Sequence, residues 1–262
     1  RTDTPVTGQF WEMPCFIKVS DNEYMLCVNP TPPNARTLYW IGKFENEKFT
    51  PYNDTPKEFE FINGNLLAPT FLIDSIGRVF YTAIIPESRN ANDQKAAGWR
   101  HTFSIPREVR FLPDKQTIGH IPHPNLCRLQ TNKVSISERA IESGTSFNLP
   151  EISGSQLELN FKIKASDDAL FQIHVFKNED KKEFTSIRFD YANNKIAFDR
   201  RLSTLSDAVK DYRNSTFVLN SFDTLQVQIF IDHSTIEVFI DQLVVFSGRV
   251  YPSRLESNKI DL

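Results

Sequence analysis

The sequence predicts an all-β protein made of two parts. Short runs in which apolar and polar side chains alternate are separated by turn signals throughout the chain. Helical periodicity is nearly absent, and the best candidate for a helical turn is the weak pattern AVKDYRNS around residue 210. The 262 residues are enough for two domains, and 40% hydrophobic residues can fill two cores.

The first part contains a series of predicted strands and hairpins that are neighbours in the sequence. These stretches are EYMLCVNP (23–30), a strand stopped by Asn-Pro; TLYWIGKFENEKFTP (37–51), a hairpin turning near Asn46; PTFLIDSIGRVFYTAIIP (69–86), a hairpin turning at 74–77; and WRHTFSIPREVRFLP (99–113). Spacing of this kind is typical of sheets formed by neighbouring hairpins.

The pattern changes near residue 125. GHIPHPNLCRL (119–129) is predicted to be a connection, and it is followed by the strand runs SQLELNFKIKAS (155–166), ALFQIHVFKN (169–178), TSIRFDYANNKIAFDR (185–200) and DTLQVQIFIDHSTIEVFIDQLVVFSGRVY (223–251). In the last run, one face carries Leu225, Val227, Ile229 and Ile231, and the next strand repeats this with Ile236, Val238 and Ile240. This inward-facing pattern predicts a two-sheet sandwich with turns at 193–194 and 232–234.

Charge and residue spacing narrow the class of partner. The net charge of -3 gives no electrostatic reason to expect a nucleic acid or an anionic membrane surface, and no apolar run approaches membrane-spanning length. Cys15, Cys27 and Cys127 follow no metal-ligand spacing. His174 and His233 are expected to be packing or turn residues. We therefore expect no nucleic acid partner, no membrane partner and no metal site.

Five segments, taken together, carry a family resemblance. They are FWEMPCF (10–16), YWIGKFENEKFTP (39–51), NGNLLAPTFLIDSIGRVFYTAII (63–85), GWRHTFSIPREV (98–109) and IDHSTIEVFIDQLVVFSGRVYP (231–252). In this order they resemble glycoside hydrolase family 32, the family of invertases, inulinases, levanases and other β-fructosidases. The resemblance implies a five-bladed β-propeller followed by a carboxy-terminal β-sandwich. Residues 1–124 would then form later propeller blades, and residues 128–262 the sandwich.

Glu12 is the candidate catalytic residue. From the residues alone, Glu12 is either a half-exposed strand glutamate or a carboxylate placed in an apolar pocket. FWEMPCF resembles the family pattern Trp-Glu-Cys-Pro-Asp, which implies that Glu12 is the general acid/base of a retaining hydrolase. Such enzymes use two carboxyl groups about 5 Å apart. The implied reaction is hydrolysis of terminal β-D-fructofuranosyl bonds in sucrose, inulin, levan or fructo-oligosaccharides, without a metal or a cofactor.

Trp11, Asn65 and Trp99 are the candidate substrate-binding residues. By resemblance, Trp99 is either an apolar wall beside the fructosyl unit or a residue of a blade core. The sequence also departs from the family pattern: Met13 stands where the family has Cys, and Cys15 where it has Asp. Residues 65–68 read Asn-Leu-Leu-Ala where the family has Asp-Phe-Tyr-Ala. A carboxylate and a ring that face the sugar in relatives are therefore replaced.

Two further expectations concern the ionic residues of this part. Arg107 and Glu108, in the segment IPREV, are expected to form a structural ion pair rather than to contact sugar. The family nucleophile lies in a Trp-x-Asn-Asp-Pro-x-Gly segment, and an Arg-Asp-Pro segment supplies a second Asp that stabilises the transition state. Neither segment occurs in this sequence. This chain alone is therefore expected to be inactive.

Three accounts of the protein remain open at this point. The first is a β-fructosidase whose missing propeller blades lie upstream or come from a partner chain. The second is a non-hydrolytic, family-related carbohydrate-binding module or a decayed enzyme. The third is a different five-bladed propeller glycosidase, such as an arabinanase-like enzyme, and the sandwich-ending segment argues against it.

Overall fold

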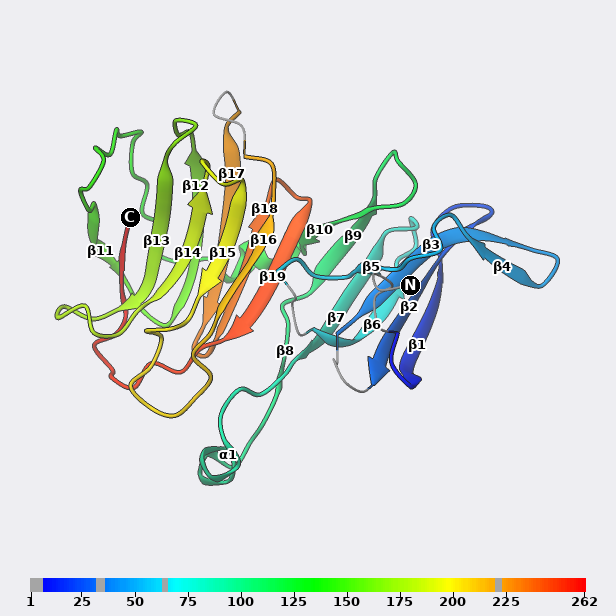
Figure 1. Ribbon diagram of the computed structural model, residues 1–262, viewed down its shortest axis with the longest axis horizontal. Helices are drawn as coiled ribbons and strands as arrows, with labels where there is room; N and C mark the ends of the chain where they lie inside the picture. Colours follow the sequence, from blue (N-terminus) through cyan, green and yellow to red (C-terminus); the bar gives the residue numbers. More distant parts are fainter. Residues whose placement is uncertain (1–6, 32–35, 63–65, 220–222) are drawn as a thin grey trace. The chain divides into compact units, whose positions relative to one another are not determined.

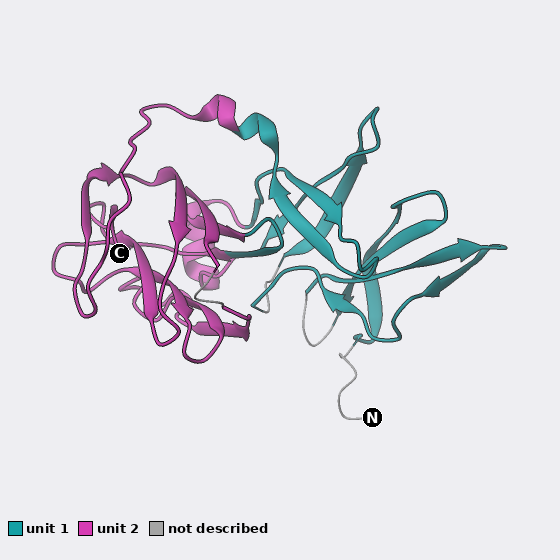
Figure 2. Ribbon diagram, turned by 90° about the horizontal axis from the view of Figure 1, so that it is seen from above, with its two compact units in different colours: residues 1–86, 101–126, 241–247 teal, residues 87–100, 127–240, 248–262 magenta. Residues whose placement is uncertain are grey.

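The computed structural model describes residues 7–31, 36–62, 66–219 and 223–262 of a nearly all-β chain. The chain forms two compact units, each built from several separate stretches of the sequence (Figure 2). Unit 1 holds residues 1–86, 101–126 and 241–247, and unit 2 holds residues 87–100, 127–240 and 248–262. The domain boundary at 124–128 remains a prediction, because the two units are not continuous in sequence.

The first sheet of unit 1 is an antiparallel meander (Figure 1). Its strands are β1 (Phe10–Lys18), β2 (Glu23–Thr31), β3 (Leu38–Glu45) and β4 (Lys48–Pro51), in that order, with β5 (Lys57–Glu58) pairing with β3. The predicted turn between β3 and β4 is confirmed. Asn46 and Glu47 both have positive φ angles, 52° and 61°, as a tight two-residue hairpin requires.

The second sheet of unit 1 repeats this arrangement. Its strands are β6 (Leu67–Ile73), β7 (Val79–Ile85), β9 (Arg107–Phe111) and β10 (Ile118–Pro122), with β8 (Thr102–Phe103) pairing with β7. The predicted turn between β6 and β7 is also confirmed. The Asp74 carboxylate accepts hydrogen bonds from the backbone N–H groups of Ile76 and Arg78, and Gly77 takes the left-handed conformation with φ of 84°. A sheet of this kind is the repeating module, or blade, of a propeller.

The expected end of β2 at Asn-Pro is wrong. β2 continues through Asn29 and Pro30 to Thr31, and Pro30 pairs with Trp11. A proline can occupy a strand where no ladder partner needs its missing N–H group. The register with β3 ends at Val28, so Pro30 interrupts no pairing on that side.

A buried network around Arg107 lies inside unit 1. The guanidinium donates from Nη1 to Oε1 of Glu60 at 2.9 Å and from Nη2 to the hydroxyl of Ser247 at 2.5 Å. It also donates to the hydroxyl of Tyr81 at 3.1 Å, and this hydroxyl lies 2.8 Å from Nδ1 of His120. Burial and the charge of Arg107 lower the pKa of His120 to about 3, so the ring is neutral at pH 7.

Arg107 and Glu108 therefore play structural roles, but the expected pairing between them is wrong. Glu108 accepts instead from Nε of Arg110 at 3.4 Å. Successive side chains of a strand point to opposite faces, so neighbours in β9 cannot meet. The side chains of Arg107 and Glu60 are both fully buried, whereas that of Arg110 is 57% exposed.

The remaining strands form two further sheets. The first has the order β11-β20-β13-β14-β15-β16, and the second β12-β17-β18-β19. Their bounds are β11 (Asn148–Ser153), β12 (Gln156–Ile163), β13 (Leu170–Lys177), β14 (Thr185–Asp190), β15 (Lys195–Asp199), β16 (Tyr212–Thr216), β17 (Leu225–Asp232), β18 (Thr235–Ile240), β19 (Val244–Arg249) and β20 (Lys259–Asp261). Figure 1 shows the sandwich, in green to orange.

The predicted inward faces of the sandwich are confirmed. Every second residue of β17 from Leu225 to Ile231 is buried, and β18 is buried along its whole length. The two sheets approach closely at Gly248, where an added Cβ would lie 2.2 Å from Cε1 of Phe198. Only glycine fits this contact between β19 and β15.

The helical segments do not lie where the sequence pattern suggested. The predicted helical turn near residue 210 is wrong, because Tyr212–Thr216 forms β16 and pairs with β15. Helix α1 (Ala91–Ala97) was missed, although its sequence carries an amino-terminal cap at Asn90 and a left-handed Gly98 at its end. A 3-10 turn, η1, spans Pro124–Leu129. Within the described segments, no helix is long and apolar enough to cross a membrane.

We predict that Arg107→Met lowers the free energy of unfolding by about 3–5 kcal/mol, because it leaves the Glu60 carboxylate buried without its cation. Urea unfolding measures the change. Arg110→Met is the matched control, and we expect a loss below about 1 kcal/mol because the Arg110 side chain is 57% exposed. The double variant Arg107→Met/Glu60→Met should lose less than Arg107→Met alone. An equal effect of the two single arginine variants would contradict this prediction.

Candidate functional site

The candidate catalytic residue Glu12 lies in β1, the edge strand of the first sheet of unit 1. It pairs with Asn29 of β2, and the register then shifts between Glu12 and Cys15. Met13 has a φ of 48°, and Pro14 lacks the N–H group that a regular ladder would use. The Met-Pro pair therefore produces a β-bulge directly after the glutamate. Bulges of this kind re-aim side chains and are frequent beside active sites.

The side chain of Asn29 organises the face of the sheet that Glu12 occupies, since directly opposed residues share a face. Asn29 is buried and donates to the Thr37 hydroxyl at 2.8 Å, while its carbonyl accepts from the backbone N–H of Ala68 at 3.0 Å. The Thr37 hydroxyl donates to the backbone carbonyl of Leu66 at 2.7 Å. The structure thus fixes residues 66–68 on the same face as Glu12.

This contact bears on the predicted sugar-binding segment 65–68. Asn65 itself lies outside the described residues. Leu66 is buried and Leu67 partly buried, so the two positions that replace the family ring serve mainly as packing residues. The described part of the segment, residues 66–68, nevertheless lies beside β2, because the Asn29 carbonyl accepts from the backbone N–H of Ala68.

Glu12 is exposed in the described chain. The apolar enclosure that the sequence suggested is therefore not built by the described residues. Trp11 is 47% exposed, donates from its indole to the carbonyl of Thr7 at 3.0 Å, and lies 5.5 Å from the ring of Trp40. Because successive strand residues alternate, Trp11 projects to the face opposite to Glu12.

Cys15 stands at the position where the family has Asp. Its thiol donates to the backbone carbonyl of Pro69 in β6 at 3.3 Å. Burial raises the pKa of this thiol, so Cys15 is neutral at pH 7. A neutral donor thus occupies the position of an anionic acceptor, which removes one negative charge from the surroundings of Glu12.

Trp99 lies in unit 2, where two arginines hold its ring. The guanidinium of Arg89 lies 4.2 Å from the ring centroid and that of Arg249 lies 5.0 Å away. Arg89 also makes a bidentate pair with Glu87, which accepts a short hydrogen bond from the Tyr251 hydroxyl. Trp99 remains 48% exposed, so it offers an aromatic surface fixed by cation–π contacts. Its role as a substrate wall remains a proposal.

The carboxylate of Glu87 is strongly acidic in this cluster. Burial by itself would raise its pKa, but hydrogen bonds from Arg89, Tyr251 and the backbone outweigh that effect and lower the pKa to about 2. Arg249 is 2% exposed and donates from Nη2 to the hydroxyl of Ser234 at 2.7 Å. No local sequence pattern predicts this cluster, because its members come from positions 87–100, 234 and 249–251.

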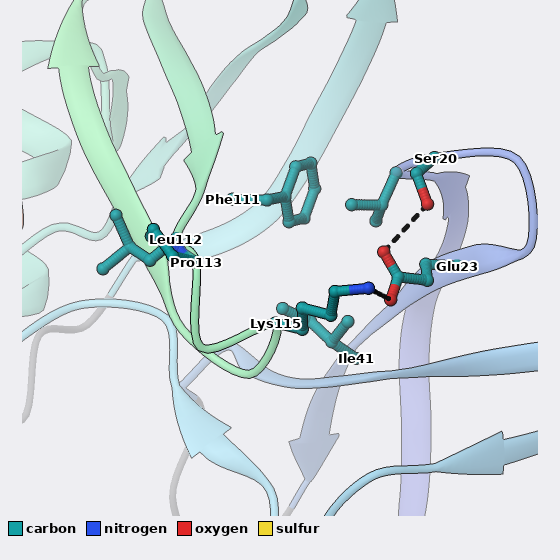
Figure 3. Close-up of a pocket in the computed structure, with 8 residues that line it drawn as sticks. Ser20, Glu23, Ile41, Phe111, Leu112, Pro113 and Lys115 are labelled. Carbon is teal, nitrogen blue, oxygen red and sulfur yellow. Dashed lines mark hydrogen bonds and ion pairs between the residues drawn. The ribbon is translucent and has the colours of Figure 1, made fainter.

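A cavity of about 230 Å³ lies elsewhere in unit 1, beyond the far end of β1 (Figure 3). Its lining residues are Val19, Ser20, Glu23, Ile41, Phe111, Leu112, Pro113 and Lys115. The carboxylate of Glu23 pairs with Lys115 at 3.2 Å and accepts from Ser20 at 2.8 Å, so its charge is balanced. None of the predicted site residues lines this cavity, and it is not the candidate catalytic site.

Among the described residues, no group of three or more His, Cys, Asp or Glu side chains could hold a metal ion. His174 contacts the carboxylate of Asp261 at 2.8 Å, and His233 occupies the turn between β17 and β18 with φ of 50°. Both histidines thus take the packing and turn roles that the sequence suggested.

Comparison with known proteins identifies the relatives of this chain. Residues 2–122 match "Glycosyl hydrolases family 32 N-terminal domain", and residues 125–262 match "Glycosyl hydrolases family 32 C terminal". An extracellular exo-inulinase from Aspergillus awamori is 22% identical, over 94% of this chain and 50% of the relative. A levanase from Bacillus subtilis (strain 168) is 24% identical, over 82% of this chain and 33% of the relative.

The fold is also similar to solved structures. The crystal structure of fructan 1-exohydrolase IIa from Cichorium intybus matches with a TM-score of 0.83 and 17% identity, covering 96% of this chain and 58% of that protein. Such neighbours have a β-propeller followed by a β-sandwich, which confirms the predicted fold class. The chain therefore spans only part of the length of these curated relatives, 50% of the exo-inulinase and 33% of the levanase.

We predict that Glu87→Gln reduces the loss of stability in acid. The folded pKa of about 2 lies below the ordinary value of 4.5, so the stabilisation is present above pH 4.5 and disappears as pH falls toward 2. Thermal unfolding between pH 7 and pH 2 measures the effect. The variant should melt lower than the parent at pH 7, and the difference should shrink in acid. Glu151→Gln, on an exposed position of β11, is the control; a constant difference across the range would contradict the prediction.

Proposed function

The chain belongs to glycosyl hydrolase family 32, and from this premise we propose that it carries the general acid/base of a β-fructosidase. The proposed reaction is hydrolysis of terminal β-D-fructofuranosyl bonds in sucrose, inulin, levan or fructo-oligosaccharides. The relatives include an exo-inulinase, a levanase and a fructan exohydrolase, which supports this substrate class. The observation that carries the proposal is Glu12, followed by a bulge and placed on the same face as residues 66–68.

In the proposed mechanism, Glu12 protonates the leaving oxygen and then deprotonates the water that cleaves a glycosyl-enzyme intermediate. An acid with this task must keep its proton near neutral pH, which requires an apolar surrounding or a nearby negative charge. Glu12 is exposed within the described chain, so the bound sugar and further protein must supply that surrounding. Trp11, Asn65 and Trp99 are proposed to contact the substrate. Because Trp11 projects to the face opposite to Glu12, its contact requires a substrate that extends around the edge of β1.

The nucleophile of the proposed mechanism comes from outside these 262 residues. The sequence contains neither the Asn-Asp-Pro nor the Arg-Asp-Pro segment of the family. Within the described part of the chain, β1 is the edge strand of its sheet, and its large exposed side chains include Phe10 (53%), Met13 (58%) and Phe16 (44%). An unpaired strand edge and exposed apolar side chains favour further β-structure beside β1. We propose that further propeller blades, or a partner chain, supply this structure and the nucleophile.

A second function is favoured by one specific observation, the neutral thiol of Cys15 in place of a carboxylate. With this substitution and without a nucleophile, the chain would act as a non-hydrolytic carbohydrate-binding module or as a decayed enzyme. Activity of the longer protein separates this account from the first.

We predict that the 262-residue chain alone releases no fructose from sucrose, inulin or levan, because one carboxylate cannot perform a double displacement. Chromatographic detection of free fructose measures this. Fructose release that Glu12→Gln abolishes would show that the chain contains its own nucleophile and would contradict the proposal.

We predict that Glu12→Gln lowers turnover of sucrose by the longer protein by about 10²- to 10⁴-fold, because acid and base assistance are both lost. Hydrolysis of an aryl β-D-fructofuranoside should suffer less, since an aryl leaving group needs less protonation. Glu45→Gln, at an exposed position of β3, is the matched control and should leave both rates unchanged. An unchanged sucrose rate in Glu12→Gln would remove Glu12 from the mechanism.

A further inference from the structure

Cys15 and Cys27 form a directly opposed pair across two antiparallel strands. The register of β1 and β2 places them as partners, three residues beyond Glu12. Cys27 is fully buried in the apolar core of unit 1, and Cys15 packs against that same core from a partly exposed position. All three cysteines of the chain, including the exposed Cys127, carry free thiols.

The strand geometry fits a covalent bond between these two sulfurs. Opposed residues of an antiparallel pair have Cα atoms about 4.5–5.5 Å apart and side chains on one face. A disulfide requires Cα atoms about 4.4–6.8 Å apart. Two effects raise the pKa of the Cys27 thiol well above its ordinary value. The larger is burial, and the smaller is the electrostatic effect of the neighbouring Cys15.

We propose that Cys15 and Cys27 are a redox-active cross-strand dithiol that a small-molecule disulfide converts to a disulfide bond. In the first step, the Cys15 thiolate attacks the small disulfide, forms a mixed disulfide and releases one thiol. In the second step, the Cys27 sulfur attacks the Cys15 sulfur and releases the second thiol. Both cysteines are oxidised, the small disulfide is reduced to two thiols, and the two cysteine protons complete those thiols.

The difference in exposure sets the order of these steps. Cys15 is the accessible thiol, whereas Cys27 has an exposure of 0% and can reach only the sulfur opposite to it. Burial raises the pKa of both thiols, so the first step is slow compared with reaction at an open site. Bond formation also requires the Cys15 sulfur to leave the Pro69 carbonyl, which ends the hydrogen bond between β1 and β6.

Peptide mapping of the 262-residue chain tests this proposal directly. The chain is incubated with oxidised glutathione, free thiols are blocked in acid with N-ethylmaleimide, and the protein is digested with trypsin. Cleavage after Arg1, Lys18 and Arg36 puts Cys15 in peptide 2–18 and Cys27 in peptide 19–36. We expect these two peptides to appear joined, with a mass two hydrogens below their sum.

The third cysteine and two variants provide the controls. Cys127 lies in peptide 116–128 and, without an opposed cysteine, should carry glutathione as a stable mixed disulfide. Cys27→Ala should leave glutathione on Cys15, because the resolving sulfur is gone. Cys15→Ser should leave Cys27 reduced, because Cys27 is buried. These results together support the dithiol.

Two results would overturn the proposal. One is stable glutathione on Cys15 in the parent chain, and the other is recovery of Cys15 and Cys27 as separate blocked peptides while Cys127 is fully modified. Circular dichroism of each variant confirms that it is folded, and the parent chain needs no substitution for the main measurement. The readout does not depend on hydrolytic activity.

Discussion

The buried charge of Arg107 is the interaction on which unit 1 depends. A guanidinium with no exposed surface must be hydrogen-bonded, because an unpaired charge inside a protein costs several kcal/mol. Glu60, Tyr81 and Ser247 meet this requirement from three distant points of the sequence. The network therefore ties segment 241–247 to strands that precede it by more than a hundred residues. His120 completes it as a neutral ring, so no second positive charge is buried beside the first.

The candidate catalytic position follows from a different constraint, the behaviour of proline at a sheet edge. Pro14 cannot join the ladder, and the resulting bulge separates Glu12 from the regular part of β1. Asn29, which pairs with Glu12 across the two strands, donates from its side-chain NH₂ to Thr37 and accepts at its side-chain oxygen from Ala68. A catalytic carboxylate needs such fixed neighbours, since its protonation depends on what surrounds it. The described residues provide the backbone frame and leave the carboxylate exposed.

The contacts of Cys15 and Trp99 in the structure show what these two residues do locally. Cys15 does not simply delete a carboxylate, because its thiol makes a new hydrogen bond to β6 and lies opposite a second cysteine. Trp99 is likewise not a core residue of a sheet. Its ring is half exposed and contacts two guanidiniums, one of which Glu87 holds in place. Both residues have local chemistry that the family motif alone does not predict.

The sequence by itself determined the fold class, the strand runs and the turns. Alternation with period two fixes which residues of β17 are buried, and the residues of the Asp74–Gly77 turn specify a local hydrogen-bond pattern. These features depend on neighbours in the chain. The sequence also pointed to Glu12 through a short motif, because the Trp-Glu pattern and its order among the other segments are local signals.

Only the tertiary structure decided which charged and polar groups meet. The partner of Arg107 is Glu60 rather than the adjacent Glu108, because adjacent strand residues face opposite sides of the sheet. Residues Tyr212–Thr216 form strand β16 rather than a helical turn, because their pairing with β15 is more stable than the weak helical pattern. The opposition of Cys15 and Cys27 depends on a register that the bulge at Met13 and Pro14 shifts. Such pairings join residues that are distant in the chain or lie on different strands, and no local pattern of side chains contains that information.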